Sequence, residues 1–294
     1  MSNAPFGRVL TAMVTPFTPD LQVDFPRAEE LAKKLIAEGN DGLIVAGTTG
    51  ESPTLSKAEK LELFKRVKQA VGKDVPIVAG TGSYDTAATV KLSQEVEATG
   101  ADALLLVTPY YNKPPQEGIY QHFAAVAKAS KLPIMLYNIP SRTGTEIHPE
   151  TLARLGELPS VKCVKQSLPS MDGINELAQR SDLAQYSGDD ANTLAILSLG
   201  GVGVVSVAGH VVGRQIKKQI EAFFNGDVHA AARLQKQLYP IFTGLFKTSN
   251  PILVKAALKQ LGFPVGGLRL PLIEATPEQE EALSQLLAGL HSIA

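Results

Sequence analysis

The segment ALLLVTPYYNKPPQEGIYQHFAAVAKASKLPIMLY, residues 103–137, begins and ends with short apolar runs. Continuous apolar runs of this kind are typical of parallel strands that are covered on both faces. The pattern recurs before residue 210, and the eight predicted strands are Val9–Thr15, Gly42–Ala46, Val75–Ala79, Ala103–Thr108, Pro133–Tyr137, Val161–Lys165, Leu183–Ser187 and Gly203–Val207. Helical patterns lie between them. We therefore expect an α/β fold, a (β/α)8 TIM barrel; a doubly wound open sheet is the alternative, and the even spacing of eight units favours closure.

The helical patterns carry their own start and stop signals. Ser56 with Glu59 is a predicted capping box at the start of one helix. After Phe224 the strand signal disappears, and three helical patterns follow at Ala230–Phe246, Pro251–Leu261 and Pro277–Leu287. We therefore expect residues 1–225 to form the barrel and residues 226–294 to form a C-terminal three-helix extension.

The composition excludes several classes of protein. The 294 residues are 44% hydrophobic and carry 28 basic against 29 acidic side chains, so no concentrated positive charge is available for a nucleic acid. The apolar runs are too short to cross a bilayer and residues 1–8 lack an apolar segment of signal-peptide type, so we expect a cytoplasmic protein. Cys163 is the only cysteine and the five histidines are scattered, so neither a disulfide framework nor a metal site is indicated.

In a (β/α)8 barrel the active site lies at the carboxyl ends of the strands. The five informative strand ends are Gly47–Glu51, Thr108–Asn112, Tyr137–Arg142, Lys165–Ser167 and Ser187–Asp190. They are rich in hydroxyl groups, phenols and cations, and they are poor in carboxylates and histidines. We therefore expect chemistry that depends on an amine and on hydroxyl groups.

Lys165 is the main candidate for that amine. Side chains alternate along a strand, so Lys165 shares a face with Val161 and Cys163, whereas Lys162 points to the other face. If the apolar pair faces the barrel interior, Lys165 does too, where a charged ammonium is costly and a neutral amine can form a Schiff base. The alternative is a lysine that extends past the strand end into solvent, and side-chain alternation alone does not decide between the two.

Hydroxyl groups near other strand ends are candidates for proton transfer. Thr48, Tyr111 and Tyr137 each carry a hydroxyl that can donate and accept, although a tyrosine more often has only a packing role. Thr48 and Thr49 lie between two glycines, and such a turn would leave N–H groups free for a small carboxylate, although it is more often only a turn.

Three further groups have two possible roles each. Arg142 follows the fifth predicted strand and is either a carboxylate clamp or a member of a surface ion pair. Asp189 and Asp190 are adjacent and point to opposite faces, and we expect one of them to cap the next helix. Cys163 is expected to be a buried packing residue and not a catalytic thiol.

Five motifs on these strand ends together resemble a known family. They are Gly47–Ser52 (GTTGES), Tyr110–Asn112 (YYN), Tyr137–Gly144 (YNIPSRTG), Lys165 and Ser187–Asp190 (SGDD). The chain thereby resembles the dihydrodipicolinate synthase family, which belongs to the pyruvate-dependent Schiff-base lyases that include N-acetylneuraminate lyase. The similarity covers nearly the whole chain, including Ser249-Asn250-Pro251.

The resemblance implies an enzyme that condenses pyruvate with L-aspartate 4-semialdehyde in the diaminopimelate route to lysine, with no metal or organic cofactor. It implies a Schiff base and then an enamine on Lys165. The implied proton relay is Thr48, Tyr137 and Tyr111, with Tyr111 supplied by a neighbouring subunit of a homotetramer that is a dimer of dimers. The implied substrate-binding residues are Thr49, Val205 and Gly188 for pyruvate and Arg142 for the carboxylate of the second substrate.

The chain departs from the family pattern in two places. Gln166 stands where an acid usually follows the lysine, and we expect little effect because its side chain should point away from the barrel interior. The lysine-effector positions are Ser52, Lys57, Tyr84 and Ala88; lysine-inhibited relatives carry a His, an Asn and a Glu at the last three. An added ammonium and a missing carboxylate should repel a cationic effector, so we expect weak or absent inhibition by lysine.

Two alternative functions remain. The first is another pyruvate-dependent aldolase of the same family, such as N-acetylneuraminate lyase or a 2-keto-3-deoxy sugar acid aldolase; Arg142 and the Thr48-Thr49 pair argue against it. The second is a non-catalytic barrel that binds a 2-oxo acid. Lys165 with Tyr137 argues against it, because a pure binder needs neither a nucleophile nor a proton relay.

Overall fold

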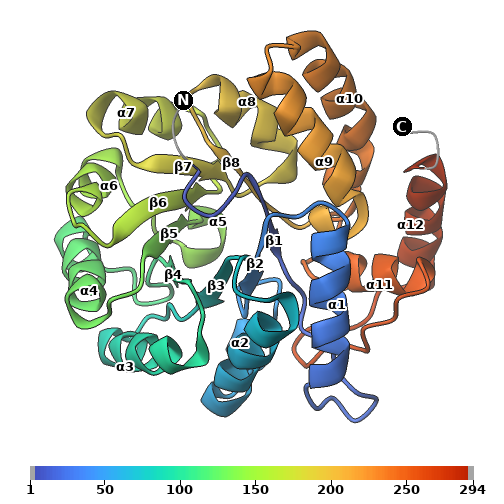
Figure 1. The fold of residues 1–294 in the computed structure, drawn as a ribbon, viewed down its shortest axis with the longest axis horizontal. Coiled ribbons are helices and arrows are strands. Elements are labelled where there is room, and N and C mark those ends of the chain that lie inside the picture. Colours follow the sequence, from blue (N-terminus) through green and yellow to red (C-terminus); the bar gives the residue numbers. More distant parts are fainter. Residues whose placement is uncertain (1–3, 291–294) are drawn as a thin grey trace.

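Eight parallel strands pair in chain order and close into a barrel in which β8 lies beside β1 (Figure 1). This computed structural model describes residues 4–290. The strands are β1 (Val9–Ala12), β2 (Gly42–Val45), β3 (Ile77–Gly80), β4 (Ala103–Val107), β5 (Ile134–Asn138), β6 (Val161–Gln166), β7 (Ala184–Ser187) and β8 (Gly203–Ser206). Each of them lies within or next to a predicted apolar run. The closed order confirms the predicted (β/α)8 barrel and excludes the open sheet.

Helices surround the barrel, and three more follow it in the chain (Figure 1). They are α1 (Phe25–Ala37), α2 (Lys57–Val71), α3 (Thr86–Val96), α4 (Gln116–Ala129), α5 (Pro140–Thr143), α6 (Pro149–Gly156), α7 (Asp172–Arg180), α8 (Thr193–Ser198), α9 (Gly209–Phe224), α10 (Val228–Gly244), α11 (Ile252–Gln260) and α12 (Pro277–Gly289). The capping box of Ser56 and Glu59 begins α2 as predicted. Among residues 4–290, no helix is both long enough and apolar enough to cross a bilayer.

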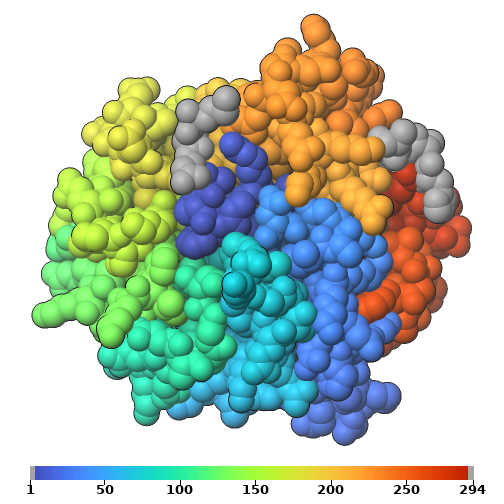
Figure 2. Space-filling view, viewed as in Figure 1, coloured from blue at the N-terminus to red at the C-terminus, as the bar shows by residue number. Residues whose placement is uncertain are grey.

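The three C-terminal helices pack on one side of the barrel. In Figure 1, α10 lies beside α9, and α11 and α12 lie beyond α1. Figure 2 shows the orange and red C-terminal segments in contact with the blue N-terminal part of the chain. The loop before α11 contacts the loop after β2 through the hydrogen bond between Asn250 and Thr49.

The apolar core has two layers, as expected for strands that are covered on both faces. One cluster fills the barrel interior, and a larger one lies between the strands and the helices. Cys163 belongs to the interior cluster, but Val161 packs in the outer one, so the prediction that these two residues share a face is wrong. The pairing of β5 with β6 shifts in register between Ile134 and Met135, and this irregularity turns the start of β6 outward.

Candidate active site

The structure places Lys165 inside the barrel, near the carboxyl end of β6. Its side chain is 6% exposed, and its Nζ lies 4.2 Å from the ring centroid of Tyr137, the residue it faces on β5. Lys162 on the same strand is exposed. Within residues 4–290, the Lys165 ammonium has no ion-pair or hydrogen-bond partner. The solvent-directed alternative for Lys165 is therefore wrong, and the buried amine is left free to react.

Gly188 at the end of β7 leaves room for this lysine. A Cβ at Gly188 would lie 2.1 Å from Ser167 Oγ and 3.0 Å from Lys165 Cε, so any larger residue would collide with Ser167 and crowd Lys165. The Ser167 hydroxyl is buried and has no hydrogen-bond partner in the part of the chain that the structure describes. Ser167 follows Lys165 by two residues, so side-chain alternation places the two on the same face.

Of the two acids after β7, Asp189 stands at the N-cap position of the one-turn helix Asp190–Asn192, as expected, but its side chain makes no capping hydrogen bond. Asp190 is fully buried, and its carboxylate accepts hydrogen bonds from the Val207 and Ala208 N–H groups and from the Ser206 hydroxyl. It therefore joins the loops that follow β7 and β8. Asp189 makes no side-chain cap; burial raises its pKa to about 6, and the nearby Lys165 ammonium opposes that rise.

Cys163 and Gln166 have structural roles. Cys163 is completely buried, and burial raises the pKa of its thiol well above the usual value, so it is a packing residue as expected. The Gln166 amide accepts from Asn138 and donates to Gln185. Gln166, which stands where the resemblance leads us to expect an acid, thus forms neutral hydrogen bonds with two other amide side chains.

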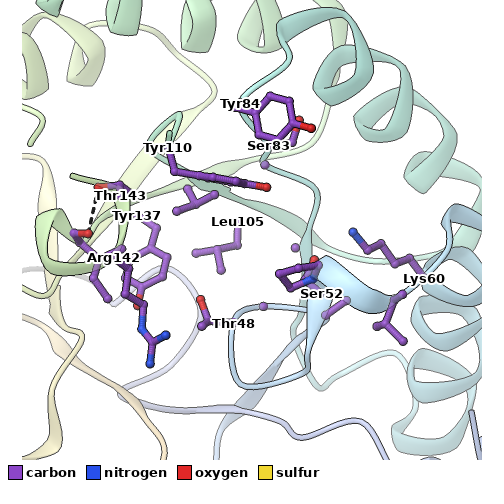
Figure 3. A pocket seen from close by; sticks show the side chains of 18 of the residues that line it. Thr48, Ser52, Lys60, Ser83, Tyr84, Leu105, Tyr110, Tyr137, Arg142 and Thr143 are labelled. Atoms are coloured by element: carbon purple, nitrogen blue, oxygen red, sulfur yellow. Dashed lines mark hydrogen bonds between the residues drawn. The ribbon is translucent and has the colours of Figure 1, made fainter. Parts of the chain in front are cut away.

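A cavity of about 440 Å³ opens at the carboxyl ends of the strands. Of the predicted residues, those that line it are Thr48, Tyr137, Arg142, Ser52, Tyr84 and Ala88. Figure 3 shows Thr48, Tyr137 and Arg142 around one end and Ser52 with Lys60 around the other. One continuous cavity thus joins two predicted catalytic residues, Thr48 and Tyr137, to three of the four predicted effector positions. Lys165 and Gly188 are not among the residues that line it.

Local hydrogen bonds hold Arg142 at the cavity. Pro140 begins the one-turn helix α5, and Gly144 ends it in the left-handed conformation. Thr143 Oγ1 donates to the carbonyl oxygens of Ile139 and Thr145, which fixes the turn. The Arg142 guanidinium is exposed and forms no ion pair with any residue between 4 and 290. This favours the carboxylate clamp over the surface ion pair.

Thr49 and Val205 do not line the cavity. Thr49 is buried, and its hydroxyl accepts a 2.8 Å hydrogen bond from Nδ2 of Asn250, which precedes α11. Val205 is buried in the barrel interior. This contact joins two residues that are far apart in the chain, so no local sequence pattern predicts it.

Two predicted residues lie away from the cavity. Tyr111 is 90% exposed, and its backbone is left-handed, with φ of 70°. That conformation is strained for a bulky residue. Lys57 is exposed and pairs with Glu95 at 2.9 Å. Tyr110 does line the cavity, where its ring packs edge-on against Tyr84, and burial raises the pKa of its hydroxyl.

Among residues 4–290, no group of three or more His, Cys, Asp or Glu side chains could hold a metal ion; His291 lies outside the described residues.

The sequence profile of the dihydrodipicolinate synthetase family matches residues 5–290. The chain belongs to this family. The 4-hydroxy-tetrahydrodipicolinate synthase of Heliobacterium modesticaldum is 58% identical over 284 residues, which are 96% of this chain and 95% of that protein. The predicted resemblance to dihydrodipicolinate synthases is confirmed.

Solved members of the dihydrodipicolinate synthetase family share the fold. The DHDPS of Cyanidioschyzon merolae, solved with lysine bound, is 45% identical with a TM-score of 0.95, over 97% of this chain and 98% of that one. The dihydrodipicolinate synthase of Acinetobacter baumannii, solved with pyruvate, is 36% identical with a TM-score of 0.94, over 98% of this chain and 100% of that one.

Proposed function

We propose that the chain acts as a 4-hydroxy-tetrahydrodipicolinate synthase, a lyase that condenses pyruvate with L-aspartate 4-semialdehyde in the diaminopimelate route to lysine. The observation that carries this proposal is the buried, unpaired Lys165 amine beside the Tyr137 ring. The curated relatives of the same name support it, as does the Arg142 guanidinium at the cavity.

The Lys165 amine begins the reaction by adding to the ketone carbon of pyruvate. Loss of water from that adduct gives an imine, and loss of a proton from the methyl carbon gives an enamine. The enamine carbon then attacks the aldehyde carbon of the second substrate, and its oxygen takes up a proton. Attack of that substrate's own amine on the imine carbon closes the ring and frees Lys165. Every step moves a proton, which is the role we assign to Thr48, Tyr137 and Tyr111.

Two carboxylates must be held while this chemistry proceeds. The Thr49 hydroxyl and N–H would bind the pyruvate carboxylate, and the backbone at Gly188 and Val205 would line the same end. Arg142 would bind the carboxylate of the aldehyde substrate through its two parallel N–H groups. Because Arg142 already lacks an ion-pair partner among residues 4–290, binding a carboxylate breaks no existing contact.

Reductive trapping tests the proposal. Borohydride added with pyruvate should reduce the imine to a stable amine, and peptide mass spectrometry should find the added mass on Lys165. A substrate panel of L-aspartate 4-semialdehyde, N-acetylmannosamine and glyceraldehyde should then show turnover with the first. An unmodified Lys165 would indicate a non-catalytic barrel, and preference for a sugar-derived aldehyde would indicate another aldolase.

We propose further that Tyr111 completes the site of a neighbouring subunit within a dimer of dimers. Its 90% exposure and strained backbone support this, because a bulky side chain held in such a conformation commonly has a functional role. Tyr111→Phe should lower kcat by about 10²-fold. Mixing Tyr111→Phe subunits with Lys165→Met subunits should restore about a quarter of wild-type activity, since half of the dimers are then hybrids with one intact site. No recovery in verified hybrids would show that Tyr111 acts within its own chain.

We expect lysine to inhibit this enzyme weakly or not at all. The cavity that Ser52, Tyr84 and Ala88 line is also lined by Lys60, and Ala88 contributes no carboxylate to it. Like charge and the absence of a carboxylate at residue 88 disfavour a cationic ligand. Steady-state assays over a range of lysine concentrations should show little inhibition, and Ala88→Glu should increase it. Half-inhibition of the wild type by sub-millimolar lysine would contradict this expectation.

A further inference from the structure

The loop between α10 and α11 contributes a side chain to the pyruvate end of the site. Asn250 is 6% exposed, and its Nδ2 lies 2.8 Å from Thr49 Oγ1. The other amide atom, Oδ1, is buried without a hydrogen-bond partner in the described chain. Asn250 is therefore held by Thr49 and makes no second side-chain hydrogen bond within residues 4–290.

The direction of this hydrogen bond determines what Thr49 can do. An amide N–H only donates, so the Thr49 oxygen accepts and its own proton remains available. No acceptor among residues 4–290 takes that proton. We infer that Asn250 is a positioning residue that keeps the Thr49 hydroxyl oriented as a donor to the carboxylate of pyruvate. This inference rests on the proposed function, in which Thr49 binds that carboxylate.

Further contacts hold the loop that contains Thr49 close to Asn250. Glu51, two residues after Thr49, forms a buried ion pair with Lys255 of α11 at 2.6 Å. The Arg269 N–H donates to Glu51 Oε2 at 3.1 Å. Because these contacts hold the loop after β2 against the C-terminal segment, the distance between Asn250 and Thr49 is set by the fold and not by the substrate.

Two substitutions at Asn250 distinguish an effect on the orientation of the Thr49 hydroxyl from an effect on side-chain packing. Asn250→Ala removes the donor, and we expect it to raise the KM for pyruvate about tenfold. Asn250→Asp keeps the size but supplies an acceptor, which takes the Thr49 proton and adds a negative charge beside the bound anion. It should raise the KM for pyruvate further than alanine does, while the KM for L-aspartate 4-semialdehyde stays within about twofold of wild type. If Asn250 only fills space, Asn250→Asp should raise the KM for pyruvate less than Asn250→Ala does. That order of the two variants would overturn the inference.

A double-substitution cycle with Thr49→Val shows whether Asn250 acts through the threonine. If it does, Asn250→Ala should have no further effect on the KM for pyruvate once the Thr49 hydroxyl is gone. Multiplicative effects would overturn the inference. Thermal unfolding of each variant, compared with wild type, identifies any loss of fold.

Borohydride trapping distinguishes failure of this inference from failure of the proposed function. Wild type and both Asn250 variants should be modified at Lys165 at saturating pyruvate, with the half-saturating pyruvate concentration raised in the variants. If the wild type is not modified at all, the proposed function fails. If it is modified and the variants show unchanged pyruvate dependence, only the role of Asn250 is refuted.

Discussion

Replacing Lys165 with methionine is expected to lower kcat by at least about 10³-fold, because it removes the nucleophile while keeping an unbranched side chain of similar length. The reaction would lose its covalent intermediate, and the hydroxyl groups that remain cannot replace an amine in imine formation. Steady-state kinetics with both substrates measure the loss. Borohydride with pyruvate should then leave residue 165 unmodified.

Lys162→Met is the matched control, since Lys162 lies on the same strand with its side chain exposed. It should keep wild-type kinetics. The Lys165→Met variant should unfold at the same temperature as wild type or higher, because a buried ammonium without an ion-pair partner among residues 4–290 is costly and a methionine is not. Full activity in Lys165→Met would show that another group attacks pyruvate.

The order of strands was predictable from the sequence because it follows from local pattern. The inward direction of Lys165 was not, because side-chain alternation left a solvent-directed lysine equally open. Buried parallel strands are continuous apolar runs, and residues two apart share a face. That rule placed Cys163 and Lys165 correctly. It failed for Val161 because the register shift opposite Ile134 depends on how β5 pairs with β6, and neither strand shows this alone.

The parts of the site that were missed all depend on contacts between distant segments. Asp190 carries a capping pattern, yet its carboxylate binds the N–H groups after β8. Asn250 reaches Thr49 only because α11 packs against the loop after β2. Hydrogen-bond partners of this kind follow from tertiary packing, for which a single sequence carries no periodic signal.

The second large effect is expected at the buried ion pair of Glu51 and Lys255. The two side chains are 1% and 2% exposed, and Lys255 also donates to the Gly267 carbonyl at 2.7 Å. Burial lowers the pKa of Lys255, and the Glu51 carboxylate opposes that effect. Lys255→Met should lower the free energy of unfolding by about 3–5 kcal/mol, since it leaves a buried carboxylate without its cation. Urea unfolding followed by circular dichroism measures the change.

The double variant Glu51→Gln with Lys255→Met tests whether the cost arises from the unpaired charge. Glutamine can still accept the hydrogen bond from the Arg269 N–H, and a neutral pair of similar size removes the buried charge altogether. The double variant should therefore regain most of the stability that Lys255→Met loses. If it is no more stable than Lys255→Met, the loss comes from packing around α11. Because Thr49 lies two residues before Glu51, recovery of stability without recovery of the KM for pyruvate would show that the ion pair also holds this loop in its binding position.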